Sequence, residues 1–228
     1  MTFSIAARCP QTGMLGIAVA SSSPAVAARC AHARAGIGAA ASQNITDPRL
    51  GTIALEALAA GKSAPDAMVQ VCKHAGSLVA YRQLMIVDRN GRTAAFSGAR
   101  TLGIHAAAEG LNVVCAGNIL KHAGVPQAMR DAFIAAPSQR LADRLLLAMQ
   151  AGLAAGGEEG PVHSAGLKIV RDVDWPIVDL RVDWHDTDPI GALAALWQLW
   201  APQMEAYVTR ALDPSAAPAF GVPGDQRT

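Results

Sequence analysis

The stretch Met1-Thr2-Phe3-Ser4-Ile5-Ala6-Ala7-Arg8 predicts a β-strand that begins at the N-terminus itself. Its side chains alternate with a period of two, which is typical of a strand with two different faces. Turn residues follow at 9–13, and the apolar run 14–20 predicts a second strand. The sequence therefore predicts that the chain starts with a β-hairpin.

After this hairpin, groups of predicted strands alternate with groups of predicted helices along the chain. Hairpins dominate among the strands, as at Asn90-Gly91, and the helices come mostly in pairs. This order predicts an α+β fold, a four-layer αββα sandwich of two largely antiparallel sheets flanked by helices. We expect one domain over residues 1–212 and a Pro/Ala/Gly-rich tail over 213–228. The further strands are expected at 36–42, 83–87, 92–96, near 104, 112–116, 163–170 and 176–182, and the helices at 48–60, 64–74, 125–135, 138–154 and 188–212.

Composition argues against several classes of protein. The 228 residues carry 19 basic and 18 acidic side chains, a net charge of +1, without a basic stripe for nucleic acid. No apolar run approaches the roughly 20 residues of a membrane span. The N-terminus lacks the layout of a signal peptide, so we expect a cytoplasmic protein. The four cysteines are too widely spaced to predict a zinc site or a disulfide framework.

Thr2 is the residue that most directly suggests chemistry. A methionine before a small residue is normally removed, which would leave Thr2 with a free α-amine beside its hydroxyl. Such a residue combines a nucleophile and a base, because an α-amine ordinarily titrates at roughly 7.7–8.0. Most chains that start Met-Thr do nothing with the threonine, so the dipeptide alone is weak evidence.

Several motifs, in this order, resemble domain-of-unknown-function family 1028. They include Gly16-Ile17-Ala18-Val19-Ala20-Ser21, Gly117-Asn118-Ile119-Leu120 and His163-Ser164-Ala165, and the resemblance extends to about residue 170. It implies the N-terminal-nucleophile (Ntn) hydrolase superfamily, with its αββα sandwich. It also implies hydrolysis of a small-molecule amide, and we expect a homo-oligomer. One loop departs from the family pattern, since residues 156–164 read Gly-Gly-Glu-Glu-Gly-Pro-Val-His-Ser where many members have two arginines and a Gln-Ser pair.

The resemblance suggests roles for residues around Thr2. Its hydroxyl would attack an amide carbonyl, and Gln43 and Asn118 would supply oxyanion donors. Arg34 would keep the amine neutral, and Ser21 or Ser22 would orient it. Arg34 is equally consistent with a solvated surface residue, and the serines with turn residues. Without the resemblance, Gln43 and Asn118 would be read as turn or strand-end residues that bond their own backbone. The predicted substrate-binding residues are Glu158, His163 and Ser164.

Two further patterns match known motifs only superficially. Asp183-x-His185-Asp186 could mimic a metal site, but its position before a helix start favours a structural role. Gly36-x-Gly38-x-x-Ala41 lacks the preceding strand of a dinucleotide fingerprint. We therefore expect no metal and no cofactor.

Three hypotheses remain at this point. The first is a threonine amidohydrolase that cleaves a small or peptide-like amide through an acyl-enzyme. The second is a catalytically silent, oligomeric small-molecule-binding protein of the same fold. The third is a metal-dependent hydrolase that uses the acids and the histidine near Asp183.

Overall fold

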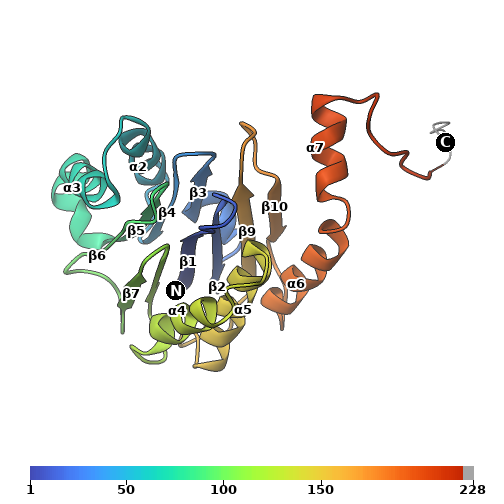
Figure 1. Ribbon diagram of the computed structural model, residues 1–228. Coiled ribbons are helices and arrows are strands. Elements are labelled where there is room, and N and C mark those ends of the chain that lie inside the picture. The colour runs from blue at the N-terminus through green and yellow to red at the C-terminus, as the bar shows by residue number, and fades with distance from the viewer. Residues whose placement is uncertain (223–228) are drawn as a thin grey trace.

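Two antiparallel sheets lie face to face in the computed structural model, which describes residues 1–222 (Figure 1). The first sheet has six strands in the order β10-β9-β2-β1-β8-β7, and the second has four in the order β3-β4-β5-β6. The central strand β1 pairs with β2 on one side and with β8 on the other. The strands are β1 (Thr2–Arg8), β2 (Leu15–Ser21), β3 (Ala31–Arg34), β4 (Gly38–Asn44), β5 (Arg82–Asp88), β6 (Thr93–Ser97), β7 (Ala106–Gly110), β8 (Val113–Asn118), β9 (Ser164–Val170) and β10 (Val178–Val182).

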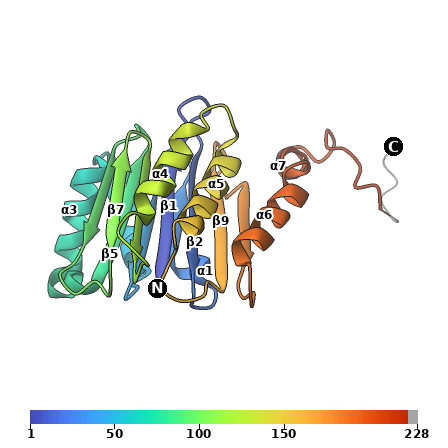
Figure 2. The same ribbon diagram turned by 90° about the horizontal axis from the view of Figure 1, so that it is seen from below.

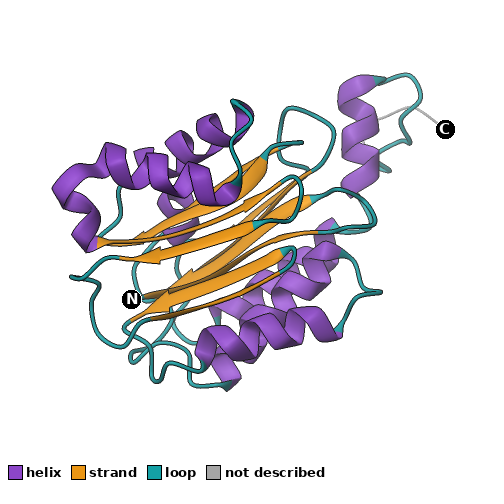
Figure 3. Ribbon diagram, turned by 60° about the vertical axis from the view of Figure 1, so that its left-hand side comes forward, coloured by secondary structure: helices purple, strands orange, loops and turns teal. Residues whose placement is uncertain are grey.

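Helices cover the outer face of each sheet. Helices α4 and α5 pack on the first sheet with α6 beside them, and α2 and α3 pack on the second (Figures 2 and 3). The expected four-layer αββα sandwich of class α+β is confirmed. The helices are α1 (Val26–Cys30), α2 (Arg49–Ala59), α3 (Ala64–Ala75), a 3₁₀ segment (Gly76–Tyr81), α4 (Val125–Ala135), α5 (Leu141–Ala154), α6 (Pro189–Trp200) and α7 (Met204–Leu212).

The alternation of the first strand decides which side chains meet the helices and which meet the second sheet. Phe3 and Ile5 are buried against the helical layer, whereas Ala6 lies in the core between the sheets. Thr2 and Ser4 share the face of Ala6, because side chains two residues apart point the same way in a strand. The polar face of β1 is therefore turned toward the second sheet.

Some boundaries differ from the prediction. The helix expected over 188–212 is two helices, α6 and α7, separated by a turn that contains Pro202, a residue that cannot continue a helix. Helix α5 begins at Leu141 after Arg140, not at a serine cap at 138. Helix α1 and strand β3 were not predicted. The cap at Ser63 is confirmed, since its hydroxyl accepts from the Asp66 amide at 3.2 Å.

The C-terminal segment leaves the sandwich after α6. Figure 1 shows α7 and the following chain projecting from the body, and residues 213–222 form neither helix nor strand. The last part of the predicted tail, 223–228, lies outside the described residues. Among residues 1–222, no helix combines the length and the apolar character needed to cross a membrane.

Candidate active site

Four polar side chains form a row across one end of the six-stranded sheet. Thr2 pairs with Asn118 in the β1/β8 ladder, and Ser21 pairs with Ser164 in the β2/β9 ladder. The Thr2 hydroxyl lies 3.4 Å from that of Ser21, which joins the two pairs. Thr2 is 5% exposed and the other three are fully buried. We call Thr2, Asn118, Ser21 and Ser164 the Thr2 row.

Ser21 connects the Thr2 row to the start of the chain. Its hydroxyl and that of Thr2 both donate to the Met1 carbonyl. The Ser23 hydroxyl lies 2.9 Å from the Ser21 hydroxyl, and the Ser23 amide donates to it at 3.1 Å. The predicted proximity of Ser21 to Thr2 is therefore observed in the structure.

A buried chain of amides lies behind the Thr2 row, between the sheets. Gln83 donates to the Gly117 carbonyl at 2.9 Å, and because a carbonyl only accepts, this contact fixes which way the Gln83 amide faces. Its Oε1 then accepts from Asn118 at 3.1 Å and from Gln43 at 2.9 Å. Gln43 in turn accepts from the Ser4 hydroxyl at 2.6 Å. These bonds order the Asn118 side chain from behind.

The network differs from the prediction at two residues, Gln43 and Gln83. Gln43, predicted to face the Thr2 hydroxyl, bonds Ser4 and Gln83, one step deeper than the Thr2 row. Gln83 was not predicted as part of the site, although it pairs directly with Gln43 in the β4/β5 ladder. The available signal was a glutamine at the polar end of an apolar strand, the same signal that pointed to Gln43.

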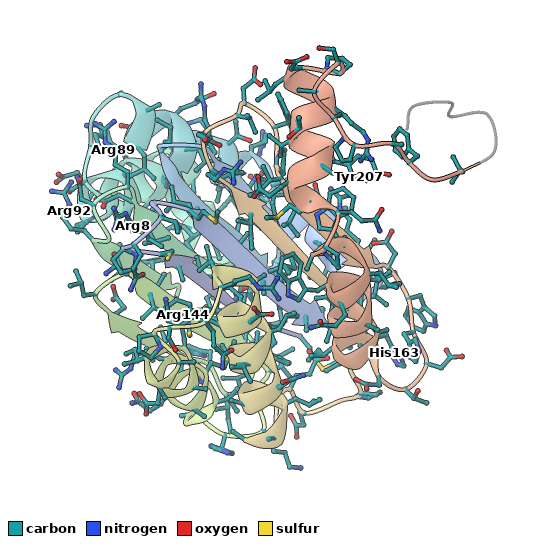
Figure 4. The ribbon with its side chains drawn as sticks, turned by 45° about the vertical axis from the view of Figure 1, so that its right-hand side comes forward. Arg8, Arg89, Arg92, Arg144, His163 and Tyr207 are labelled. Carbon is teal, nitrogen blue, oxygen red and sulfur yellow. The ribbon has the colours of Figure 1, made fainter. Side chains whose placement is uncertain are left out.

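Arg34 does not lie near Thr2, and that expectation is wrong. In the β3/β4 ladder Arg34 pairs with Gly38, whereas Gln43, near the other end of β4, approaches the face of Thr2 and Ser4. Arg34 is exposed at the opposite end of the molecule. That end also holds Arg8, at the end of β1, and the β5–β6 turn with Arg89 (Figure 4). The unpredicted strand β3 is the reason, because it carries Arg34 away from the site.

Glu158 is a buried carboxyl group across the start of β1. Its backbone bridges to Leu120, just beyond β8, while its side chain lies near Ser22, just beyond β2. Since β1 lies between β8 and β2, the carboxyl group lies over the first residues of the chain. It is 4% exposed, and within the described residues neither carboxylate oxygen has a hydrogen-bond partner of good geometry.

The surroundings of Glu158 favour its neutral form. Burial raises the pKa of Glu158 to about 7, because a charged carboxylate is poorly solvated there. The chain's amino group and Ser22 act in the opposite direction but do not outweigh burial. The Asn118 Oδ1 atom is likewise buried without a partner within residues 1–222. The site therefore contains one buried acceptor without a partner, Asn118 Oδ1, and a buried carboxyl group that can donate when it is neutral.

The two other predicted substrate-binding residues lie beside Ser21 but have local partners. The Ser164 hydroxyl donates to the Ser23 carbonyl at 2.6 Å and accepts from the Val26 amide at the start of α1. His163, labelled in Figure 4, lies 3.0 Å from the His185 carbonyl through its Nδ1. Its ring stacks on that of Trp184, with 4.3 Å between the ring centres. These contacts give both residues a structural role, and substrate binding by them stays a prediction.

The acids and the histidine near Asp183 form a turn. His185 Nδ1 accepts from the amides of Thr187 and Asp188, and Asp188 caps α6 by accepting from Gly191 at 2.8 Å. Within residues 1–222, no three His, Cys, Asp or Glu side chains are grouped as metal ligands. These contacts leave nothing in favour of the metal-site hypothesis at this turn.

Comparison with known proteins places the chain in a family. The model of a family of unknown function, DUF1028, matches residues 2–193. The chain belongs to the DUF1028 family. A crystal structure of a DUF1028 protein, SPO2555 from Silicibacter pomeroyi, has 34% sequence identity and a TM-score of 0.81, covering 87% of this chain and 85% of its own.

Other solved structures are more distant from this DUF1028 chain. HslV from Trypanosoma brucei has 11% identity and a TM-score of 0.46, covering 74% of this chain and 98% of its own. Anbu from Yersinia bercovieri has 10% identity and a TM-score of 0.41, covering 90% and 96%. No curated protein matches the sequence.

Proposed function

We propose that this DUF1028 protein is an N-terminal threonine amidohydrolase that cleaves a small or peptide-like amide. The observation that carries the proposal is the position of the Thr2 hydroxyl. It is buried at the first residue of the central strand, and it contacts the hydroxyl of Ser21 and the carbonyl of Met1. Removal of Met1 replaces that carbonyl with a free α-amine on the same residue as the hydroxyl.

The proposed reaction has two stages. In the first, the Thr2 oxygen attacks the amide carbonyl carbon while the α-amine takes the hydroxyl proton. The tetrahedral intermediate then expels the amine product, which receives that proton, and an ester to Thr2 remains. In the second, water attacks the ester with the α-amine again acting as base, and the carboxylic acid leaves. Thr2 regains its proton, so the enzyme is unchanged and needs neither a metal nor a nucleotide.

The neighbours of Thr2 support this scheme in different ways. Ser21 is the residue proposed to orient the α-amine, because its hydroxyl lies 3.4 Å from that of Thr2 and loses its Met1 acceptor when Met1 is removed. Asn118 is the proposed oxyanion donor. It gives one N–H hydrogen to Gln83 and retains a second, since an amide nitrogen carries two. Arg34 has no part in the mechanism, because it lies at the other end of the sheet.

We also propose that the protein forms a homo-oligomer in the cytoplasm. The structural support for the oligomer is the apolar surface of α6, where Leu199 is 68% exposed and Leu196 is also exposed. Sedimentation velocity measures the oligomeric state directly. A strictly monomeric protein would contradict this part and leave the chemistry of Thr2 unaffected.

The test of the function combines mass and activity. The intact mass of purified protein shows whether Met1 is removed, and a panel of amides, lactams and ureides screens for hydrolysis. We expect a mature chain that starts at Thr2 and releases an amine from at least one substrate. Fully retained Met1, with no turnover of any substrate, would instead support a silent binding protein of the same fold.

A further inference from the structure

A cavity of about 320 Å³ lies at the end of the first sheet that is far from Thr2. It is bordered by the β1–β2 turn, the loop before α5 and the start of α5, and Trp197 of α6 and Met204 of α7 contribute to its wall. The whole of β1, roughly 20 Å for a strand of this length, separates its Cys9 from Thr2. Most of its wall is apolar: Met14, Leu141, Ile169, Ile177, Trp197 and Met204.

The polar side of the cavity carries a positive charge. Arg140 is the only charged side chain among the described residues that line it. Its guanidinium lies 5.0 Å from the centre of the Trp197 ring and donates to Asp143 at 2.8 Å. Asp143 also accepts from the Trp197 indole at 2.7 Å, so it fixes both groups from outside the cavity wall.

A second cation lies one turn further along α5. Arg144 is only 6% exposed and donates twice to the Phe133 carbonyl, at 3.2 and 3.1 Å (Figure 4). Within residues 1–222 it forms no ion pair with an Asp or Glu. A buried cation without a counter-ion is costly. Arg144 lies behind the cavity wall, with its guanidinium also 3.8 Å from the centre of the Phe133 ring. Near this end of the cavity, two arginines therefore stand against the single carboxylate of Asp143.

Cys9 is a buried thiol on the cavity wall. Burial opposes ionisation of its thiol, but hydrogen bonds from Thr12 and Gln11, with a smaller contribution from the charge of Arg144, outweigh burial and lower the pKa of Cys9. The start of α5 has no side-chain cap, although Asp143 lies in its first turn, and a helix N-terminus favours negative charge. Leu141 and Ala142, which belong to that first turn, line the cavity.

We propose that this cavity is a second binding site, which takes a small apolar molecule with one carboxylate group. The apolar body packs against Trp197 and Ile177, and the carboxylate lies at the side formed by Arg140 and the start of α5. The volume is near the lower end of the roughly 300–1,000 Å³ of small-molecule pockets. It equals the space of about ten waters, which suits an acid with a comparable number of non-hydrogen atoms.

Calorimetric titration with octanoate, octanol and octylamine tests the charge preference at constant chain length. We expect octanoate to bind at least about 10-fold more tightly than either of the others, because charge-assisted hydrogen bonds are the stronger kind. Arg140→Gln should remove most of that preference and leave octanol binding unchanged. Equal affinity of unaltered protein for octanoate and octanol would overturn the proposal.

Two variants locate the bound acid. Ala142→Leu fills the cavity and should abolish octanoate binding, whereas Ala154→Leu makes the same change on an exposed position at the far end of α5 and should not. Octanoate binding that is unchanged in Ala142→Leu would place the acid elsewhere. Thr2→Ala should bind octanoate normally, so this site and the proposed amidohydrolase can fail independently.

Thiol labelling tests the same site in the unaltered chain. Octanoate should slow the reaction of iodoacetamide with Cys9 several-fold, as read by peptide mass spectrometry. Cys72, which is half-buried and outside the cavity, is the internal control and should react at an unchanged rate. Equal rates at Cys9 with and without saturating octanoate would contradict the proposal. Because this test uses the unaltered chain, it does not depend on whether a variant folds.

Discussion

The side-chain amide of Asn118 donates to Oε1 of Gln83, 3.1 Å away, across the interface between the two sheets. Asn118 stands in the Thr2 row of the first sheet, and Gln83 belongs to the second. The orientation of a residue beside the proposed nucleophile thus depends on the packing of one sheet on the other. Both residues are fully buried, so neither amide can exchange its partner for water.

Replacing Gln83 should therefore disturb the site and the fold together. Gln83→Met leaves the side-chain amides of Asn118 and Gln43 without the acceptor that they share, and each buried unpaired group costs about 1–3 kcal/mol. We expect the free energy of unfolding to fall by at least about 2 kcal/mol in urea denaturation. Gln150→Met on the exposed face of α5 is the control. If Gln83→Met lowers the free energy of unfolding by as little as Gln150→Met does, the hydrogen-bond network assigned to Gln83 is contradicted.

Thr2 should be indispensable to hydrolysis but not to folding. Thr2→Ala removes the nucleophilic oxygen and should abolish turnover, while Thr2→Ser keeps a hydroxyl in the same place and should retain part of it. The rate should rise with pH as the α-amine loses its proton and then level off. Thermal unfolding of both variants should resemble that of unaltered protein. Chelator-sensitive hydrolysis that survives Thr2→Ala would falsify the threonine mechanism.

Asn118 should affect the rate more than substrate binding. Loss of one oxyanion donor typically lowers kcat by about 10²–10³, and Asn118→Ala should do so with little change in KM. Steady-state kinetics on an amide found in the screen measures both constants. Asn90→Ala, in the exposed β5–β6 turn, serves as the comparison and should leave kcat unchanged. A kcat for Asn118→Ala within a few-fold of the control would remove Asn118 from the oxyanion role.

Glu158 should make stability depend on pH. Its pKa is about 7 in the folded chain against 4.5 as its ordinary value, so the folded state holds a proton that the unfolded state has lost between these pH values. Stability from this group is therefore fully present below pH 4.5 and is lost as pH rises to about 7. A shift of this size corresponds to about 3 kcal/mol.

The neutral variant Glu158→Gln should not show this loss of stability with rising pH. Relative to unaltered protein, its unfolding free energy should increase steadily between about pH 4.5 and 7 and then stay constant. Glu159→Gln, the exposed neighbour, provides the matched control and should show no such trend. Denaturation curves at several pH values measure the difference, and parallel pH profiles for Glu158→Gln and unaltered protein would contradict the raised pKa.

The local elements of the fold could be predicted because their causes are local. The alternation over residues 2–8 predicts β1, the Asn90-Gly91 pair predicts the β5–β6 hairpin, and the Ser63 cap predicts the start of α3. Each depends on side-chain periodicity or on a hydrogen bond within a few residues. Pro202, which separates α6 from α7, was a local signal in the sequence that the prediction of a single helix over 188–212 did not use.

The sequence by itself determined that polar residues would occur at strand ends, with Thr2 first among them. Only the tertiary structure decided which of those ends meet. Ser21 and Asn118 flank Thr2 because β2 and β8 are the neighbours of β1, whereas the unpredicted β3 carries Arg34 to the opposite end. The partnership of Asn118 with Gln83 and the burial of Glu158 depend on register and on sheet packing. Both arise from contacts between residues far apart in the chain, which no local pattern encodes.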